Sequence, residues 1–130
     1  MECSECSAGL VTFEIPPEFR EYLPGEEQAA GLCTRCLSLE PVTGSVPGSP
    51  AFEEVSDAFP TNPDAALPMA LLIGLLSNLA LYRSEISSLL ASVERAGTDP
   101  LLVLDRLATD PAVETDIDLR GRRRQLEQLL

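Results

Sequence analysis

The four cysteines constrain this chain more than any other feature, because they fall into two Cys-x-x-Cys pairs. Cys3 and Cys6 form the first pair, Cys33 and Cys36 form the second, and 26 residues lie between the pairs. Each Cys-x-x-Cys turn can place two sulfurs at adjacent corners of a tetrahedron, so the two turns together offer four thiolate ligands. The spacing therefore predicts a metal site made of Cys3, Cys6, Cys33 and Cys36.

Zinc is the expected metal because it prefers four tetrahedral thiolates at about 2.3 Å. Iron accepts the same donors and is the weaker alternative. Four protein ligands leave no coordination position for water or substrate, so the site is expected to be structural rather than catalytic. Two disulfides or a redox dithiol are further alternatives. Reducing cytoplasm disfavours the disulfides, and the acidic neighbours Glu2 and Glu5 disfavour a redox cysteine of low pKa.

The residues between the two cysteine pairs favour a zinc-ribbon layout. The expected elements follow in chain order: a strand at 10–15 ended by Pro16-Pro17, one helical turn at 18–23, a turn at Pro24-Gly25, a returning segment at 28–32 and a short strand at 37–39. About forty residues with one hairpin bury little apolar area, so bound metal is expected to supply much of their stability.

Composition changes sharply after this segment. Residues 41–50 hold three prolines and two glycines and read as a linker. The following stretch is ambiguous, with Phe52, Val55 and Phe59 on one face. We divide the chain into a zinc-ribbon-like domain at 1–40, a linker and short segment at 41–62, and a leucine-rich helical module at 63–130. The expected fold class is α+β, a small β zinc ribbon followed by a helical bundle.

The first helix is expected to be long. Residues 65–82 carry no charge and just reach the length of a membrane span. Pro68, Gly74, Ser77 and Asn78, together with the lack of basic residues before the segment, argue against a membrane. Apolar residues step by three and four in an unbroken series: Leu72, Leu75, Leu79, Tyr82, Ile86, Leu89 and Val93. This heptad pattern predicts a single core helix over about 65–96, with a break near 82–84 as the alternative.

Helix boundaries are marked clearly in the second half. Asn62-Pro63 predicts a helix start, Gly97 a helix end, Asp99-Pro100 a second start and Asp118 a third. The third helix would carry Leu119, Leu126 and either Leu129 or Leu130. Seventeen of the 22 leucines lie beyond residue 60, which predicts a leucine-packed bundle. A surplus leucine face could be buried by a protein partner or by homodimerisation.

The charged residues exclude several chemistries. The net charge is −12, all nine basic residues are arginines, and the chain has no lysine, histidine or tryptophan. Without histidine there is no Ser-His-Asp or Cys-His pair and no imidazole base. Acidic composition without lysine is expected of an extreme halophile that keeps molar salt in its cytoplasm; an ordinary acidic protein is the alternative. The first residues lack the basic and apolar regions of a signal peptide, which favours the cytoplasm.

One basic cluster could contact phosphate: Arg120, Arg122, Arg123 and Arg124. Acidic residues on either side favour charge neutralisation as its role. Asp116 and Asp118 could be proposed as an acid–base pair, but their spacing beside a helix start favours caps. With no glycine-rich phosphate loop either, the chain is not expected to be an enzyme.

Several of these residues together resemble a known family. They are Cys3-x-x-Cys6, Cys33-x-x-Cys36 followed by Leu37, the block from Glu94 to Leu107 and the closing arginine-rich helix. The family comprises uncharacterised haloarchaeal proteins of about this length, a domain of unknown function with a zinc-ribbon-like N-terminus and a helical C-terminus. The resemblance covers most of the chain, and the 94–107 block is its most specific part. It implies four cysteine ligands and a halophilic origin, and no activity. Ser7 and Leu37 stand where ribbons frequently carry glycine.

The sequence therefore predicts a non-enzymatic, zinc-binding acidic protein that acts as an interaction or regulatory module in a halophilic cytoplasm. Its expected partner is another protein or a second copy of the chain. The alternative is a nucleic-acid-associated ribbon that uses the 120–124 arginines. Residues 1–60 hold eleven acidic residues and two arginines, and zinc held by four thiolates would add a formal −2. Nucleic acid is thus an unfavourable partner and no membrane contact is expected.

Overall fold

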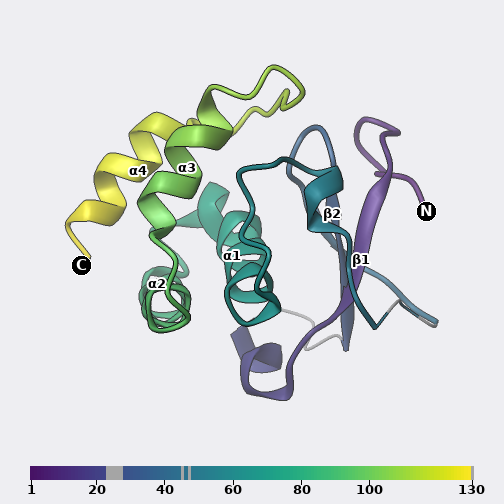
Figure 1. Ribbon diagram of the computed structural model, residues 1–130, viewed down its shortest axis with the longest axis horizontal. Helices are drawn as coiled ribbons and strands as arrows, with labels where there is room; N and C mark the ends of the chain where they lie inside the picture. The colour runs from purple at the N-terminus through teal and green to yellow at the C-terminus, as the bar shows by residue number, and fades with distance from the viewer. Residues whose placement is uncertain (23–27, 45, 47, 130) are drawn as a thin grey trace.

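The computed structural model describes residues 1–22, 28–44, 46 and 48–129. The chain is an α+β protein with a small antiparallel sheet at its N-terminus and helices in its C-terminal half, as the sequence predicts. Figure 1 shows helix α1 (Pro63–Leu75) between the sheet on one side and the remaining long helices on the other. The predicted Pro24-Gly25 turn, and Leu23, Ser45, Pro47 and Leu130 of other predicted segments, lie outside the described residues.

The sheet has three strands in the order β1-β2-β3: Leu10–Glu14, Ala29–Cys33 and Leu39–Pro41. The first strand lies where its β-branched and aromatic residues predict it. The last begins at Leu39 rather than at Leu37, because Leu37 still belongs to the second cysteine turn and has a positive φ of 65°. Strand β2 is central and all five of its residues are buried, which places the second cysteine pair at the end of the best-protected strand.

Two short 3₁₀ helices lie in the connections between the longer elements. The first, η1 (Pro17–Tyr22), lies where the sequence predicts one helical turn, and it buries Phe19. The second, η2 (Phe52–Glu54), resolves the ambiguous segment after the linker. Its Phe52 ring stacks on Phe59 at 5.3 Å between ring centroids and lies equally close to Phe13 of the sheet. The aromatic face predicted for this segment therefore packs into the core.

The single long helix predicted over 65–96 is wrong. Helix α1 ends at Leu75, a 3₁₀ turn η3 (Leu76–Asn78) follows, and α2 begins only at Arg83 and runs to Arg95. A straight helix of that length would extend about 48 Å, far beyond a core of this size. The break lets α2 fold back against α1, so the residues of the heptad series from both sides of the turn still share one core.

The last two helices begin where the sequence predicts. Asp99 caps α3 (Pro100–Ala108) through the amide groups of Leu101 and Leu102, and Asp118 caps α4 (Leu119–Glu127) through Gly121. Gly97 ends α2 with a left-handed φ of 92°. These boundaries depend on contacts within one turn of chain, which is why sequence alone could place them.

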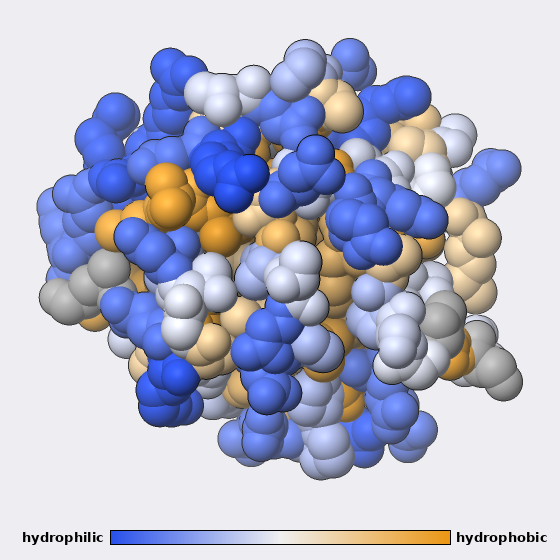
Figure 2. Space-filling view, in the orientation of Figure 1, coloured by the Kyte–Doolittle hydropathy of each residue, from blue (hydrophilic) through white to orange (hydrophobic). Residues whose placement is uncertain are grey.

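One hydrophobic core joins both halves of the chain. It runs without interruption from Val11 in the sheet, through Leu72 in α1, to Leu126 in α4. Figure 2 shows hydrophilic side chains over most of the visible face, with apolar side chains gathered at the left over α3. Within the described ranges, none of the helices has the length and apolar character needed to cross a membrane.

Candidate metal centre

The first cysteine turn is built from residues 2–9. An isolated antiparallel bridge pairs Glu2 with Gly9, and the Cys3 amide donates to the Ala8 carbonyl oxygen at 2.7 Å. Ser7 donates its amide to the Cys3 carbonyl oxygen at 3.0 Å and takes a left-handed φ of 65°. These bonds close the loop tightly, so the Cys3 and Cys6 side chains point to the same side.

The second cysteine turn repeats this construction at the end of β2. The Cys33 amide donates to the Ser38 carbonyl oxygen at 2.9 Å, and Leu37 has the same φ of 65° as Ser7. The Leu37 side chain is completely buried, so it anchors this turn to the core. The two turns are therefore a matched pair, although one is anchored by a leucine and the other ends in an exposed serine.

The β1–β2 pairing brings the two turns together. Leu10 lies opposite Cys33 in the strand register. One step beyond it, both the amide and the hydroxyl of Thr34 donate to the Gly9 carbonyl oxygen at 3.0 Å. The hairpin thus closes a separation of 26 residues and places the turns face to face.

The four predicted ligands form one cluster. The sulfurs of Cys3 and Cys36 are 3.7 Å apart, those of Cys6 and Cys33 are 3.4 Å apart, and all four lie within 4.8 Å of one another. A tetrahedron with metal–sulfur bonds of about 2.3 Å has edges of roughly 3.8 Å, so the cluster fits such an ion. The cysteines are free, with sulfurs well beyond the roughly 2.05 Å of a disulfide bond.

Backbone amides point at two of the sulfurs. The Glu5 amide lies 3.4 Å from Cys3 Sγ, and the amides of Arg35 and Cys36 each lie 3.4 Å from Cys33 Sγ. Such donors stabilise a thiolate and hold it towards the cluster's centre. Burial nevertheless raises the pKa of the Cys33 thiol to about 12 in the metal-free chain. A thiol of this kind is a poor nucleophile, whereas a bound cation would displace its proton.

Side chains around the cluster link one turn to the other. Ser4 donates its amide and its hydroxyl to the Glu40 carboxylate at 3.2 and 2.8 Å. Ser38 lies 3.1 Å from Cys36 Sγ and donates to the Glu5 carboxylate at 3.0 Å. Sequence reasoning missed Ser4, Ser38 and Glu40 as supporting residues. Only the position of Ser4 inside a Cys-x-x-Cys pair could have indicated its role.

The other candidate residues lie on or beside α4, and Asp116, Asp118 and Arg122 line the same cavity as Cys36. Arg123 pairs with Asp105 at 2.7 Å and with Glu127, and Arg122 donates to the Gln125 side chain at 3.0 Å. Arg120 and Arg124 are exposed. The cap role of Asp118 is confirmed, while Asp116 lies in the connection before α4. The structure brings Asp116 and Asp118 to no common partner among the described residues.

Fold and site together define a small α+β protein with a four-cysteine cluster that could hold a metal ion. The chain belongs to the family of unknown function DUF6276, whose model matches residues 2–130. Neither the curated proteins nor the solved structures provide a significant match.

Proposed function

We propose that this protein is a non-enzymatic zinc protein whose metal holds the N-terminal sheet in shape for an interaction or regulatory role. The observation that carries the proposal is the cluster of four sulfurs at tetrahedral spacing. All four coordination positions would be filled by Cys3, Cys6, Cys33 and Cys36. A closed site of this kind stabilises structure and leaves no place for a substrate.

Zinc is favoured over iron by its preference for tetrahedral thiolates and by the absence of any need for redox chemistry in a structural site. Iron with four thiolates would also fold the turns, so the metal must be identified directly. Zinc in such a site contributes on the order of 10 kcal/mol to folding in small peptides. Here the same ion would also stabilise β2, which belongs to the core shared with the helices.

The non-enzymatic part of the proposal is supported by the side chains around the site. The acidic side chains of Glu5 and Glu40 are occupied by hydrogen bonds that brace the two turns, rather than being free for acid–base chemistry. We assign the partner to another protein or a second copy of the chain, in a cytoplasm rich in salt. A nucleic-acid role is the weaker proposal because Arg123, at the middle of the arginine cluster, already pairs with two carboxylates.

The decisive experiment is metal analysis of the full chain, purified in molar salt without a metal-affinity column. We expect one zinc per chain by mass-spectrometric elemental analysis. Cys33→Ser should lose the zinc together with the protected amides of β1 and β2. Thr34→Ser is the matched control, since it lies in the same turn and keeps the hydroxyl that donates to Gly9.

Each outcome separates the alternatives. Visible absorption from charge transfer would identify iron, because zinc has a filled d shell and no such bands. A chain without metal, whose four thiols react freely or are oxidised, would refute the proposal and restore the disulfide or redox interpretation. Retention of zinc in Cys33→Ser would show that the cluster is not its binding site.

A further inference from the structure

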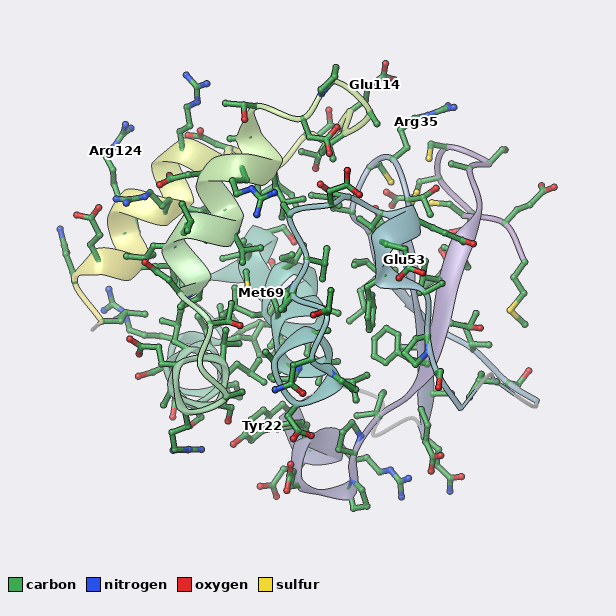
Figure 3. The ribbon with its side chains drawn as sticks, in the orientation of Figure 1. Tyr22, Arg35, Glu53, Met69, Glu114 and Arg124 are labelled. Carbon is green, nitrogen blue, oxygen red and sulfur yellow. The ribbon has the colours of Figure 1, made fainter. Side chains whose placement is uncertain are left out.

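The connection between α3 and α4, residues 109–118, has no helix or strand and makes two hydrogen bonds to distant parts of the chain. Near its start, the buried Ser56 hydroxyl donates to the Asp110 carboxylate at 2.5 Å. In its middle, the Glu114 amide donates to the carbonyl oxygen of Arg35 at 2.8 Å. Figure 3 shows Glu114 and Arg35 beside each other at one edge of the molecule.

The second of these contacts reaches the candidate metal site itself. Arg35 lies between the ligands Cys33 and Cys36. The peptide plane that contains the Cys36 amide, which points at Cys33 Sγ from 3.4 Å, also contains the carbonyl group of Arg35. The direction of this carbonyl group is therefore set by the shape of the cysteine turn. Among the described residues, no other hydrogen bond or ion pair joins residues 1–44 to residues 48–129.

On either side of this bond, Val113 and Ile117 of the connection are partly buried against the hydrophobic core. Next to the bond lies a cavity of about 630 Å³, with Cys36–Leu39 along one wall and Thr115–Asp118 along another. The cavity lies between the connection and the cysteine turn, and the hydrogen bond from Glu114 to Arg35 links the two beside it. The hydrogen bond of the Glu114 amide thus depends on where the Arg35 carbonyl oxygen points.

We propose that metal occupancy of the four-cysteine site is coupled to docking of the 109–118 connection, so that the α3–α4 pair responds to the metal. The inference rests on the metal function proposed above. A bound ion holds all four sulfurs and with them the Arg35 peptide group, which keeps the acceptor in place for Glu114. Without the ion the turn loosens, the acceptor is lost, and the connection around Glu114 is released from the turn.

The anchor at Asp110 does not depend on the metal. Its hydrogen bond with Ser56, and a second one from the Ala112 amide, lower the pKa of the Asp110 carboxyl below its ordinary value. The carboxylate therefore stays ionised and bonded at neutral pH in both states. Because coupling between two sites is reciprocal, docking of the connection must also strengthen metal binding.

Amide hydrogen exchange of the full chain, zinc-loaded and metal-free under reducing conditions, tests the coupling. We expect the Glu114 amide to exchange at least about ten-fold faster without zinc, while the Leu104 amide inside α3 keeps its rate. Equal exchange at Glu114 in both states would overturn the inference. Equal acceleration at Leu104 would overturn it too, because it would show global unfolding rather than release of the connection.

A pair of variants tests whether docking of the connection strengthens metal binding. Glu114→Pro removes the amide donor, whereas Glu114→Ala keeps it and removes only the side chain. Zinc affinity, measured by competition with a chelator, should fall roughly five-fold or more in Glu114→Pro and stay unchanged in Glu114→Ala. Wild-type affinity in Glu114→Pro would overturn the coupling. A wild-type chain that takes up no zinc would instead refute the metal function itself, so the two failures are distinct.

Discussion

Ser7 and Leu37 end the two cysteine turns, and both have a φ of 65°. This left-handed conformation costs an L-residue roughly 1–2 kcal/mol, and glycine adopts it freely. The sequence has serine and leucine at two positions where zinc ribbons frequently have glycine. Both residues nevertheless adopt the left-handed conformation. At Leu37 the cost is offset by a fully buried side chain, whereas Ser7 is exposed and has no such compensation.

Glycine should therefore have opposite effects at these two positions. Ser7→Gly is expected to raise the free energy of unfolding of the zinc-loaded protein by about 0.5–1 kcal/mol, since it relieves the backbone. Leu37→Gly should lower it by about 2–4 kcal/mol, because a core side chain is lost. Urea unfolding measures both, with Gly9→Ala as a control whose added Cβ meets no atom within 4 Å. Destabilisation by Ser7→Gly would contradict the account.

At the scale of elements, the contact between α1 and β3 joins the helices to the sheet. Gly74 lies on α1 against Leu39, the first residue of β3. A Cβ at Gly74 would lie 2.5 Å from Leu39 Cδ2 and 2.6 Å from its Cβ. The second atom cannot move without the strand backbone, so glycine is needed for the close approach despite its low helix propensity.

Gly74→Ala should thus destabilise the protein even though alanine favours the helix. We expect a loss of about 1–3 kcal/mol in the free energy of unfolding, as in other overpacked cores. Adding Leu39→Ala removes the clashing atoms beyond Cβ, and part of the loss caused by Gly74→Ala should then disappear. A double-mutant cycle in urea measures this coupling. Additive effects would show that α1 and β3 do not meet as closely as described.

At the scale of the whole molecule, charge is poorly balanced. The chain carries 21 acidic residues and nine arginines. Among the described residues, ion pairs involve only Arg20 and Arg123. Most carboxylates therefore repel one another across the surface, and this repulsion destabilises the folded chain at low salt.

Salt should consequently stabilise the zinc-loaded protein. Raising KCl from 0.1 to 2 M is expected to increase the melting temperature by at least roughly 5 °C, on the order of 1 kcal/mol for a domain of this size. Scanning calorimetry across several KCl concentrations provides the measurement. A melting temperature that stays level or falls with KCl would contradict the halophilic interpretation of the composition.

Features that depend on short stretches of chain could be predicted from the amino-acid sequence. The four clustered cysteines follow from two local spacings, and helix starts at Asn62, Asp99 and Asp118 follow from caps that act within one turn. The β1 strand follows from its side chains alone. Each of these signals is complete within a few residues, so no knowledge of distant contacts is needed to interpret it.

Features that depend on contacts between distant segments could not be predicted in this way. The heptad series continues past Leu76, but only the size of the core requires the chain to turn there and fold α2 back on α1. Likewise, nothing near Glu40 or Glu114 in the sequence indicates that one braces Ser4 and the other binds the Arg35 carbonyl oxygen. Those contacts join residues brought together by the hairpin and the shared core, because long-range geometry arises only when the whole chain packs.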